Sequence, residues 1–249
     1  MIAKALELLG RDRLLYADML NLLSHPAECP DVQLLCADER GVMLSMDGGT
    51  TCMTALFDRD TARELLSMLD RPRLITSHQE WSEPIIEEMF GPISDNTRCL
   101  QLVYTRGERL PVADCGVEIR SMTPEYIPAA AACYHMGDAD YLTGRMEKGE
   151  LFGAFIGDEL AGFVGFHSET SIGMLEVLPQ YRRRGIGRAL ESAMINRQLE
   201  RGFVPFGQVV LGNEASMALQ RSLGFETAEG IVSWLTTRYA ESERAWENN

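Results

Sequence analysis

The feature that most constrains this chain is the segment at residues 177–188, where an apolar run passes through a tight loop directly into an amphipathic helix. It reads Val-Leu-Pro-Gln-Tyr-Arg-Arg-Arg-Gly-Ile-Gly-Arg. From there, apolar residues recur at helical spacing, and they give the helix one face that can pack on a sheet: Ile186, Ala189, Leu190, Ala193 and Met194. The segment therefore predicts a layered α/β fold in which this helix covers a sheet.

The same segment predicts an anion-binding site. The first turn of a helix offers free backbone N–H groups and the positive end of the helix dipole. Gly185 and Gly187 let a ligand approach the backbone, and four arginines within residues 182–188 add positive charge. A diphosphate suits such a site. The alternative interpretation is a solvated charge run beside glycines that serve only the turn.

Two common nucleotide motifs do not fit the segment. A dinucleotide-binding fingerprint needs a third glycine where Leu190 stands, and an acidic residue about twenty positions later. The chain has Phe206, Gly207 and Gln208 there instead. A Walker-type loop needs a Gly-Lys-Ser/Thr sequence, which is also missing.

Charge and composition exclude several classes of partner. The chain has 249 residues, of which 23 are basic and 37 acidic, so the formal net charge is −14. Such a charge opposes non-specific binding to nucleic acids or anionic membranes. No apolar run reaches the ~20 residues that a membrane-spanning helix needs. We therefore expect neither a nucleic acid nor a membrane as a partner.

The cysteine and histidine spacing predicts a reduced protein without a metal. Six cysteines occur without any C-x-x-C pair, and four histidines lie far apart in the sequence. We therefore predict cytoplasmic thiols and no zinc site.

The order of predicted elements nearly repeats along the chain. Helices in residues 2–23 precede strands at 32–37, 42–46 and 51–57, a helix at 60–69, a strand at 74–77, a helix at 82–90 and a strand at 98–104. After a linker at 105–116, the second series comprises a strand at 117–121, helices in 124–147, strands at 151–156, 160–166 and 172–178, a helix at 185–201, a strand at 204–211, a helix at 213–223 and a strand pair around Phe225 and 231–235.

Several residues of the second half give the sequence a resemblance to the GCN5-related N-acetyltransferase (GNAT) superfamily. The diphosphate loop of that family reads Arg/Gln-x-x-Gly-x-Gly/Ala, which Arg182, Gly185 and Gly187 match. The resemblance extends to the V-x-P-x-Y run before the loop and to a second block formed by Asn213, Leu219, Leu223, Gly224 and Phe225. It covers about residues 117–235. Within the family, residues 174–187, Pro205-Phe206 and 213–216 most resemble the glycine N-acyltransferase branch.

The resemblance implies a fold and a cofactor site. The implied fold is a mixed, mostly antiparallel twisted sheet flanked by helices, with acetyl-CoA or another acyl-CoA bound as co-substrate where the fourth and fifth strands separate. The backbone of Leu175, Glu176 and Val177 would pair with the pantetheine amides, and Asn213 and Ser216 would line the other side. The diphosphate would be wrapped by the loop residues Arg182, Arg183, Arg184, Gly185, Ile186, Gly187 and Arg188.

Catalysis in this family requires the orientation of an unprotonated amine and removal of a proton. The candidate bases are Glu176, His167 and Glu169, and for each the alternative is a structural or solvated residue. Many relatives carry a tyrosine acid after the helix leucine, but this chain has Gln220 after Leu219. A glutamine can only offer a hydrogen bond.

The first half lacks the chemistry of the loop. In its repeat, the counterpart is residues 57–62, which contain no glycine and two carboxylates, Asp58 and Asp60. Carboxylates suit helix capping and would repel a diphosphate. We therefore expect a degenerate GNAT-like or unrelated α/β domain at 1–110 and the catalytic domain at 111–249.

The leading hypothesis is an N-acyltransferase that moves an acetyl or other short acyl group to a primary amine of a small molecule such as an amino acid. A non-catalytic acyl-CoA-binding module is the first alternative. A protein N-terminus or lysine as the acceptor is the second. The sequence does not specify the oligomeric state.

Overall fold

The chain folds into two compact units, each built from segments that are not contiguous. The computed structural model describes residues 1–134 and 136–242, the last two by their backbone only. The first unit contains Met1–Leu102, Val209–Asn213 and the residues from Thr227 onward, and the second contains Val103–Gln208 and Glu214–Glu226. The domains at 1–110 and 111–249 stay a prediction. The two units have different bounds, because the last strand of the chain belongs to the first unit.

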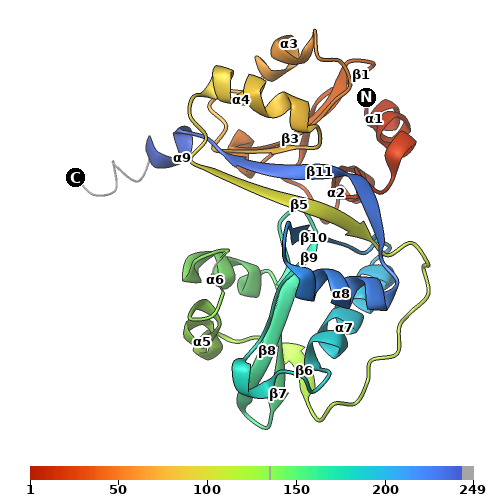
Figure 1. Cartoon of the computed structure of the whole chain (residues 1–249), viewed down its shortest axis with the longest axis vertical. Coiled ribbons are helices and arrows are strands. Elements are labelled where there is room, and N and C mark those ends of the chain that lie inside the picture. The colour runs from red at the N-terminus through yellow and green to blue at the C-terminus, as the bar shows by residue number, and fades with distance from the viewer. Residues whose placement is uncertain (135, 243–249) are drawn as a thin grey trace. The chain divides into compact units, whose positions relative to one another are not determined.

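The first unit is built on a large sheet (Figure 1). In chain order its elements are α1 (Ile2–Leu9), α2 (Ala17–Ser24), β1 (Gln33–Asp38), β2 (Gly41–Met46), β3 (Thr51–Leu56), α3 (Ala62–Leu66), β4 (Leu74–Ser77), α4 (Glu83–Phe90), β5 (Asp95–Val103), β11 (Glu226–Thr236) and α9 (Tyr239–Ser242). The strand order is β1-β2-β3-β4-β11-β5-β10, and β10 is Phe206–Val210. β3 and β4 are parallel, whereas β1–β2, β2–β3 and β4–β11 are antiparallel.

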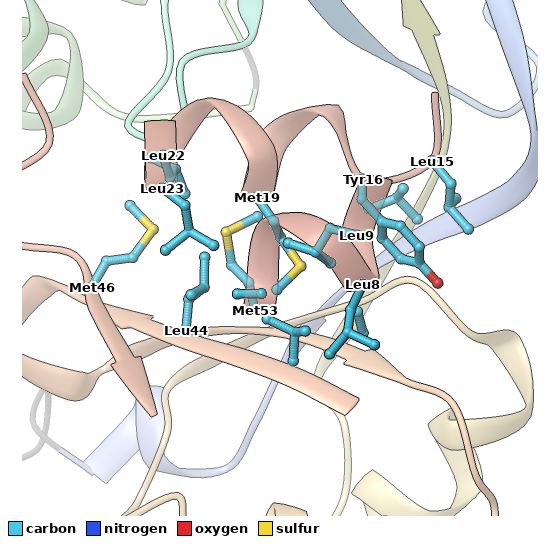
Figure 2. Close-up of a cluster of buried hydrophobic side chains, with 14 of the residues drawn as sticks. Leu8, Leu9, Leu15, Tyr16, Met19, Leu22, Leu23, Leu44, Met46 and Met53 are labelled. Atoms are coloured by element: carbon cyan, nitrogen blue, oxygen red, sulfur yellow. The ribbon is translucent and has the colours of Figure 1, made fainter. Parts of the chain in front are cut away.

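Helices cover both faces of this sheet. Neighbouring residues of a strand point to opposite sides, so each face has its own side chains to pack against helices. Leu44 of β2 packs with α1 and α2, in a cluster that contains Leu8 and Met19 (Figure 2). Met43, next to Leu44, packs instead with Leu65 of α3 and with residues of α4.

A buried polar pair joins α2 to the strands. His78, which follows β4, places Nε2 2.9 Å from Oδ2 of Asp18 and Nδ1 2.9 Å from the carbonyl oxygen of Thr54. Because both ring nitrogens face acceptor oxygens, a doubly protonated ring satisfies both contacts. Burial lowers the pKa of His78, but the charge and hydrogen bonds of Asp18, with that of Thr54, outweigh burial and leave the pKa raised.

The last strand corrects one expectation. The sequence predicts a strand pair around Phe225 and residues 231–235, but β11 runs without a break from Glu226 to Thr236. Gly230, inside this strand, lies where a Cβ atom would come 2.9 Å from Leu15 Cδ1. The glycine therefore serves a close approach inside the first unit rather than a change of chain direction.

The second unit is a four-stranded antiparallel sheet with helices. Its strands are β6 (Glu118–Ser121), β7 (Leu151–Ile156), β8 (Glu159–Phe166) and β9 (Ile172–Val177), paired in that order. Its helices are α5 (Ile127–Ala131), α6 (Ala139–Glu147), α7 (Ile186–Glu200) and α8 (Glu214–Leu223). The expected fold class, a mixed and mostly antiparallel sheet flanked by helices, is confirmed.

The helix singled out by the sequence packs as its apolar pattern predicts. Ile186, Ala189, Leu190 and Met194 of α7 are buried, and the helix lies against β8 and β9. The linker is fixed along this helix: Asn196 Oδ1 accepts a hydrogen bond from the N–H of Leu110 at 2.7 Å, and Asn196 Nδ2 donates to the Leu110 carbonyl at 2.8 Å. At its other end, α7 begins shortly after the end of β9.

Candidate functional site

The loop between β9 and α7 leaves the first turn of the helix without an internal cap. Gly185 occupies the N-cap position in the left-handed conformation, with φ of 85°, and Arg183 also has a positive φ of 64°. No side chain caps the helix, and its first turn contains no acidic residue. The free N–H groups and the positive end of the dipole are therefore available to an anion.

The loop arginines keep their charge uncompensated. Arg182 donates from Nε to the carbonyl of Val177 at 2.9 Å, and Arg184 donates to the carbonyl of Gln180 at 3.1 Å. Arg188 donates to Ser222 Oγ at 2.8 Å. These contacts orient the guanidinium groups without neutralising them, since none of the four arginines forms an ion pair with a carboxylate in the described part of the chain. All four are exposed.

Gly187 leaves the inner side of the loop open. A Cβ atom at this position would lie 3.6 Å from Val177 Cγ2 and 3.9 Å from Leu219 Cδ2, which is ordinary contact. A longer side chain would enter the space beside β9. The loop therefore fits a diphosphate by its donors, its charge and its lack of side chains.

A bulge distorts β9 just before the loop. Phe163 pairs with Glu176 and Gly165 with Gly173, so three steps on β9 match two steps on β8. The extra residue lies at Met174, whose φ is 56°. A bulge breaks the regular ladder and redirects backbone groups. Because β9 is also the last strand of its sheet, the backbone of half-buried Leu175–Val177 lies at the outer edge of the described sheet.

His167 is held next to this bulge. Its Nδ1 lies 2.5 Å from the hydroxyl of Tyr141 on α6, and its Nε2 lies where a Cβ on Gly173 would be 2.3 Å away. Arg145 donates to the His167 carbonyl at 3.1 Å and forms an ion pair with Glu150. Burial lowers the pKa of His167, and Arg145 adds to this while Glu169 opposes it. The ring is therefore neutral at pH 7 and able to accept a proton.

The two other predicted bases lie near His167 and Tyr134. Glu169 is buried and accepts a hydrogen bond from Ser171 Oγ. Glu176 is half-buried on β9, directly opposite Phe163. The pKa of Tyr134 is raised by burial first and then by the charges of Glu169 and Glu176. The structure thus gathers all three candidate bases on one unit.

The remaining predicted residues lie around α8. Ser216 is half-buried in its first turn, and Asn213 is exposed just before it, where its N–H donates to the Val210 carbonyl at 3.0 Å. Gln220 is 4% exposed, and its Nε2 occupies the space beside Gly207. Its Oε1 has no hydrogen-bond partner among the described residues. Gln220 is therefore turned into the packing against β10.

The sequence analysis missed Tyr134 and Tyr141. The signal for Tyr141 was present: Asp138 caps α6 by accepting from the Tyr141 N–H at 2.9 Å, and Tyr141 and Arg145 are one turn apart. Nothing in the sequence indicates that this turn faces His167, which is far along the chain. Tyr134 follows a short helix of weak pattern, α5.

Metal binding and membrane insertion have little support in the described ranges. No three His, Cys, Asp or Glu side chains in residues 1–134 and 136–242 could jointly hold a metal ion. His135, one of the four histidines considered, lies outside the described residues. None of the described helices has the length and apolar character to cross a membrane.

Comparison with known proteins shows which family the second half of the chain resembles. Residues 119–225 match the model of the acetyltransferase (GNAT) family. Among solved structures, a Drosophila protein superposes with a TM-score of 0.73 at 18% identity, over 96% of both chains. The chain has the GNAT fold. A GCN5-related N-acetyltransferase from Kribbella flavida superposes at a TM-score of 0.56 and 15% identity over 91% of this chain and 95% of that one.

A putative GNAT-family acetyltransferase from Novosphingobium aromaticivorans gives a TM-score of 0.54 at 16% identity, over 90% of this chain and 96% of that one. No curated protein matches the sequence. The match and the GNAT fold support the superfamily, whereas the glycine N-acyltransferase-like branch stays a prediction.

Proposed function

We propose that the protein is an N-acyltransferase that transfers an acetyl or other short acyl group from CoA to a primary amine of a small molecule. The single observation that carries the proposal is the β9–α7 loop, with its uncapped helix start and unpaired arginines, inside the segment that matches the acetyltransferase family. Acyl-CoA dependence and the small-molecule acceptor are parts of the proposal.

The residues proposed to hold acyl-CoA divide into two groups. The loop and the first turn of α7 would bind the diphosphate through backbone N–H groups and guanidinium charge. The outer edge of β9 at Leu175–Val177 would pair with the pantetheine amides, next to the bulge. Asn213 and Ser216 would complete the site from the start of α8.

The proposed chemistry needs one proton acceptor and no covalent nucleophile. Glu176 would accept a proton from the bound ammonium, directly or through one water. The resulting amine would attack the thioester carbon and form a C–N bond. The nitrogen would then lose its surplus proton to solvent, the C–S bond would break, and the thiolate would leave and take a proton from solvent. His167, which is neutral at pH 7, and Glu169 are the alternative acceptors. Backbone N–H groups freed by the β9 bulge would stabilise the developing oxyanion.

The first unit receives a supporting role in this proposal. Its counterpart of the loop, between β3 and α3, is closed by Asp58, which accepts hydrogen bonds from Thr61 Oγ1 at 3.0 Å and from the Asp60 N–H at 3.1 Å. Asp58 thus holds the turn before α3 and does not cap the helix, because no side chain caps α3. It still leaves negative charge where a diphosphate would bind. We keep the proposal of a degenerate GNAT-like domain at 1–110 and a cytoplasmic location.

The proposal is tested by incubating the protein with acetyl-CoA and a panel of amines and measuring release of free thiol. Release that depends on both substrates is the expected result, and Gly187→Glu should abolish it. Binding of acetyl-CoA by calorimetry without release under any condition would instead support the non-catalytic binding module. Preference for peptides over every small amine would favour a protein acceptor.

A further inference from the structure

The backbone of His167 is fixed by hydrogen bonds on both of its polar groups. Its N–H donates to the Ser171 carbonyl at 3.0 Å, and its carbonyl accepts from the Thr170 N–H at 3.0 Å and from Arg145 at 3.1 Å. The same turn is tied to α7, because Gln198 donates to the Thr170 carbonyl. A residue whose backbone is held in this way presents its side chain from one fixed position.

The imidazole ring of His167 is held as firmly as its backbone. The Tyr141 hydroxyl oxygen lies 2.5 Å from Nδ1, and the two rings stack with their centroids 5.9 Å apart and their planes at 26°. At its other nitrogen the ring lies against Gly173 of β9, where a Cβ atom would collide with Nε2. Gly173 directly precedes Met174, the residue at the β9 bulge. The ring therefore lies between α6 and the bulged part of β9.

Tyr141 decides which ring nitrogen carries the proton. Burial lowers the pKa of His167, so the ring is neutral at pH 7 and has one N–H donor and one acceptor nitrogen. A phenol is a stronger acid than a neutral imidazole, and an imidazole nitrogen is a stronger base than a phenol oxygen. We therefore assign the bond as a donation from the Tyr141 hydroxyl to Nδ1, which leaves the ring proton on Nε2.

The Nε2–H group is open to a ligand. Nε2 has no hydrogen-bond partner among the described residues. The side chain of His167 is half-buried, and Nε2 is not one of the fully enclosed atoms that lack a partner. The fold thus supplies a rigid, neutral hydrogen-bond donor beside the β9 bulge, and this donor needs an acceptor atom.

We propose that His167 donates its Nε2–H to the carbonyl oxygen of the bound acyl group, and that Tyr141 is the positioning residue for this donor. The inference rests on the proposed function and deepens it, because it makes His167 a hydrogen-bond donor rather than an alternative base. The acyl oxygen fits this donor because the pantetheine is proposed to run along Leu175–Val177, directly after the bulge.

The donor would act on the charge that develops during the reaction. When the amine attacks the thioester carbon, one electron pair of the C=O bond moves onto the oxygen, which becomes negative. His167 keeps its proton and stabilises this oxygen until the C–S bond breaks and the C=O double bond forms again. A donor that is fixed before the reaction stabilises such an oxyanion without having to reorganise.

Two substitutions of His167 separate a donor from a base. His167→Gln keeps an N–H donor near the position of Nε2 but cannot accept a proton, whereas His167→Leu removes both functions. We expect His167→Leu to lower kcat about a hundredfold or more, the usual effect of removing one oxyanion donor. His167→Gln should stay within about tenfold of the wild-type kcat. Equal loss in the two variants would overturn the inference, and so would an effect on the KM of the amine alone.

Tyr141→Phe tests the positioning role. It removes the hydroxyl that holds the ring and should lower kcat by up to about tenfold, with the KM for acetyl-CoA unchanged. Tyr126→Phe is the matched control, because it removes a hydroxyl that donates to the Asp158 carbonyl at 3.0 Å in the same unit, and it should leave kcat unchanged. If Tyr141→Phe also leaves kcat unchanged, Tyr141 does not position His167.

Nitrogen NMR of histidine-labelled protein tests the donor without the reaction. At pH 8 the His167 signals, identified by their loss in His167→Gln, should show an unprotonated Nδ1 and a protonated Nε2, and Tyr141→Phe should mix the two forms. Acetyl-CoA should shift the Nε2–H signal, whereas CoA, which lacks the acyl carbonyl, should not. If this pattern appears but no amine releases thiol, the proposed reaction fails and the donor stands. If thiol is released but Nε2 is unprotonated, the reaction stands and the donor fails.

Discussion

Glu176 is the base that we propose first, because it lies on the edge strand β9 beside the bulge. Glu176→Gln keeps the size and the hydrogen-bonding capacity of the side chain but removes the proton acceptor. We expect kcat to fall about a hundredfold or more, within the usual range for general base catalysis. Steady-state kinetics measures the change, and calorimetry should show nearly unchanged acetyl-CoA affinity.

His167→Asn and Glu169→Gln are the matched comparisons for Glu176→Gln. If Glu176→Gln stays within about threefold of the wild-type kcat and one of the other two is crippled, the base lies in the turn at 167–169. If all three remain active, no dedicated base is needed, and positioning of an already unprotonated amine carries the catalysis.

Gln220 should contribute little to the chemistry. Its side chain is buried against Gly207, and a neutral hydrogen bond is worth roughly 0.5 to 1.5 kcal/mol. We therefore expect Gln220→Ala to lower kcat by no more than about tenfold, which single-turnover kinetics would measure. A loss above about a thousandfold would mean that Gln220 acts on the reacting atoms.

At the level of the elements, the β9–α7 loop should account for acyl-CoA binding. Acetyl-CoA at about 100 times its dissociation constant should stabilise the fold by about 2.7 kcal/mol. Gly187→Glu should abolish this stabilisation, since it places a long anionic side chain beside β9 at the helix start. The measurement is the shift in thermal unfolding on adding acetyl-CoA.

Two control variants accompany Gly187→Glu. Gly187→Ala adds only a Cβ, which meets Val177 and Leu219 at ordinary contact distances, so it tests whether the position itself tolerates substitution. Asp58→Ala changes the corresponding loop of the first unit and should leave the stabilisation intact. If Asp58→Ala and Gly187→Glu reduced the stabilisation by acetyl-CoA equally, acetyl-CoA binding could not be assigned to the β9–α7 loop.

The elements that could be predicted from the sequence are those with a strong period or a clear stop signal. α7 follows its apolar stripe, and the three strands before it follow their apolar runs to within two residues. The bulge at Met174 could not be predicted, because a bulge is a misfit between two strands and neither strand alone encodes it. The same holds for the site, since the loop arginines are adjacent in sequence whereas Tyr134 and Tyr141 reach the bases only through the fold.

For the molecule as a whole, a buried carboxyl should make stability fall as the pH rises. Glu191 on α7 is 2% exposed, and its Oε1 has no partner among the described residues. Burial raises its pKa from 4.5 to about 8. The folded protein therefore keeps this proton over a pH range in which the unfolded chain has released it. Stability falls as the pH rises from about 4.5 to about 8, by at most about 5 kcal/mol.

Chemical denaturation at pH 6 and pH 9 would measure this loss. Glu191→Gln mimics the protonated side chain, so it should make the protein more stable at pH 9 and reduce the difference between the two pH values. The raised pKa of His78 acts in the same direction, because the stability of the His78–Asp18 pair is present below the unfolded pKa of 6.5 and is lost as the pH rises through the folded value. If the stability of the Glu191→Gln protein changed between the two pH values as much as that of the wild type, the role of Glu191 would be refuted.

The return of β11 to the first unit also sets the order in which a newly made chain can finish folding. β11 lies between β4 and β5 in the sheet, yet it is synthesised after both of them and after the whole second unit. A nascent chain that ends before residue 226 has neither edge of that gap paired, and unpaired strand edges are prone to join other chains. The part of the protein that leaves the ribosome first is therefore the part that completes its sheet last.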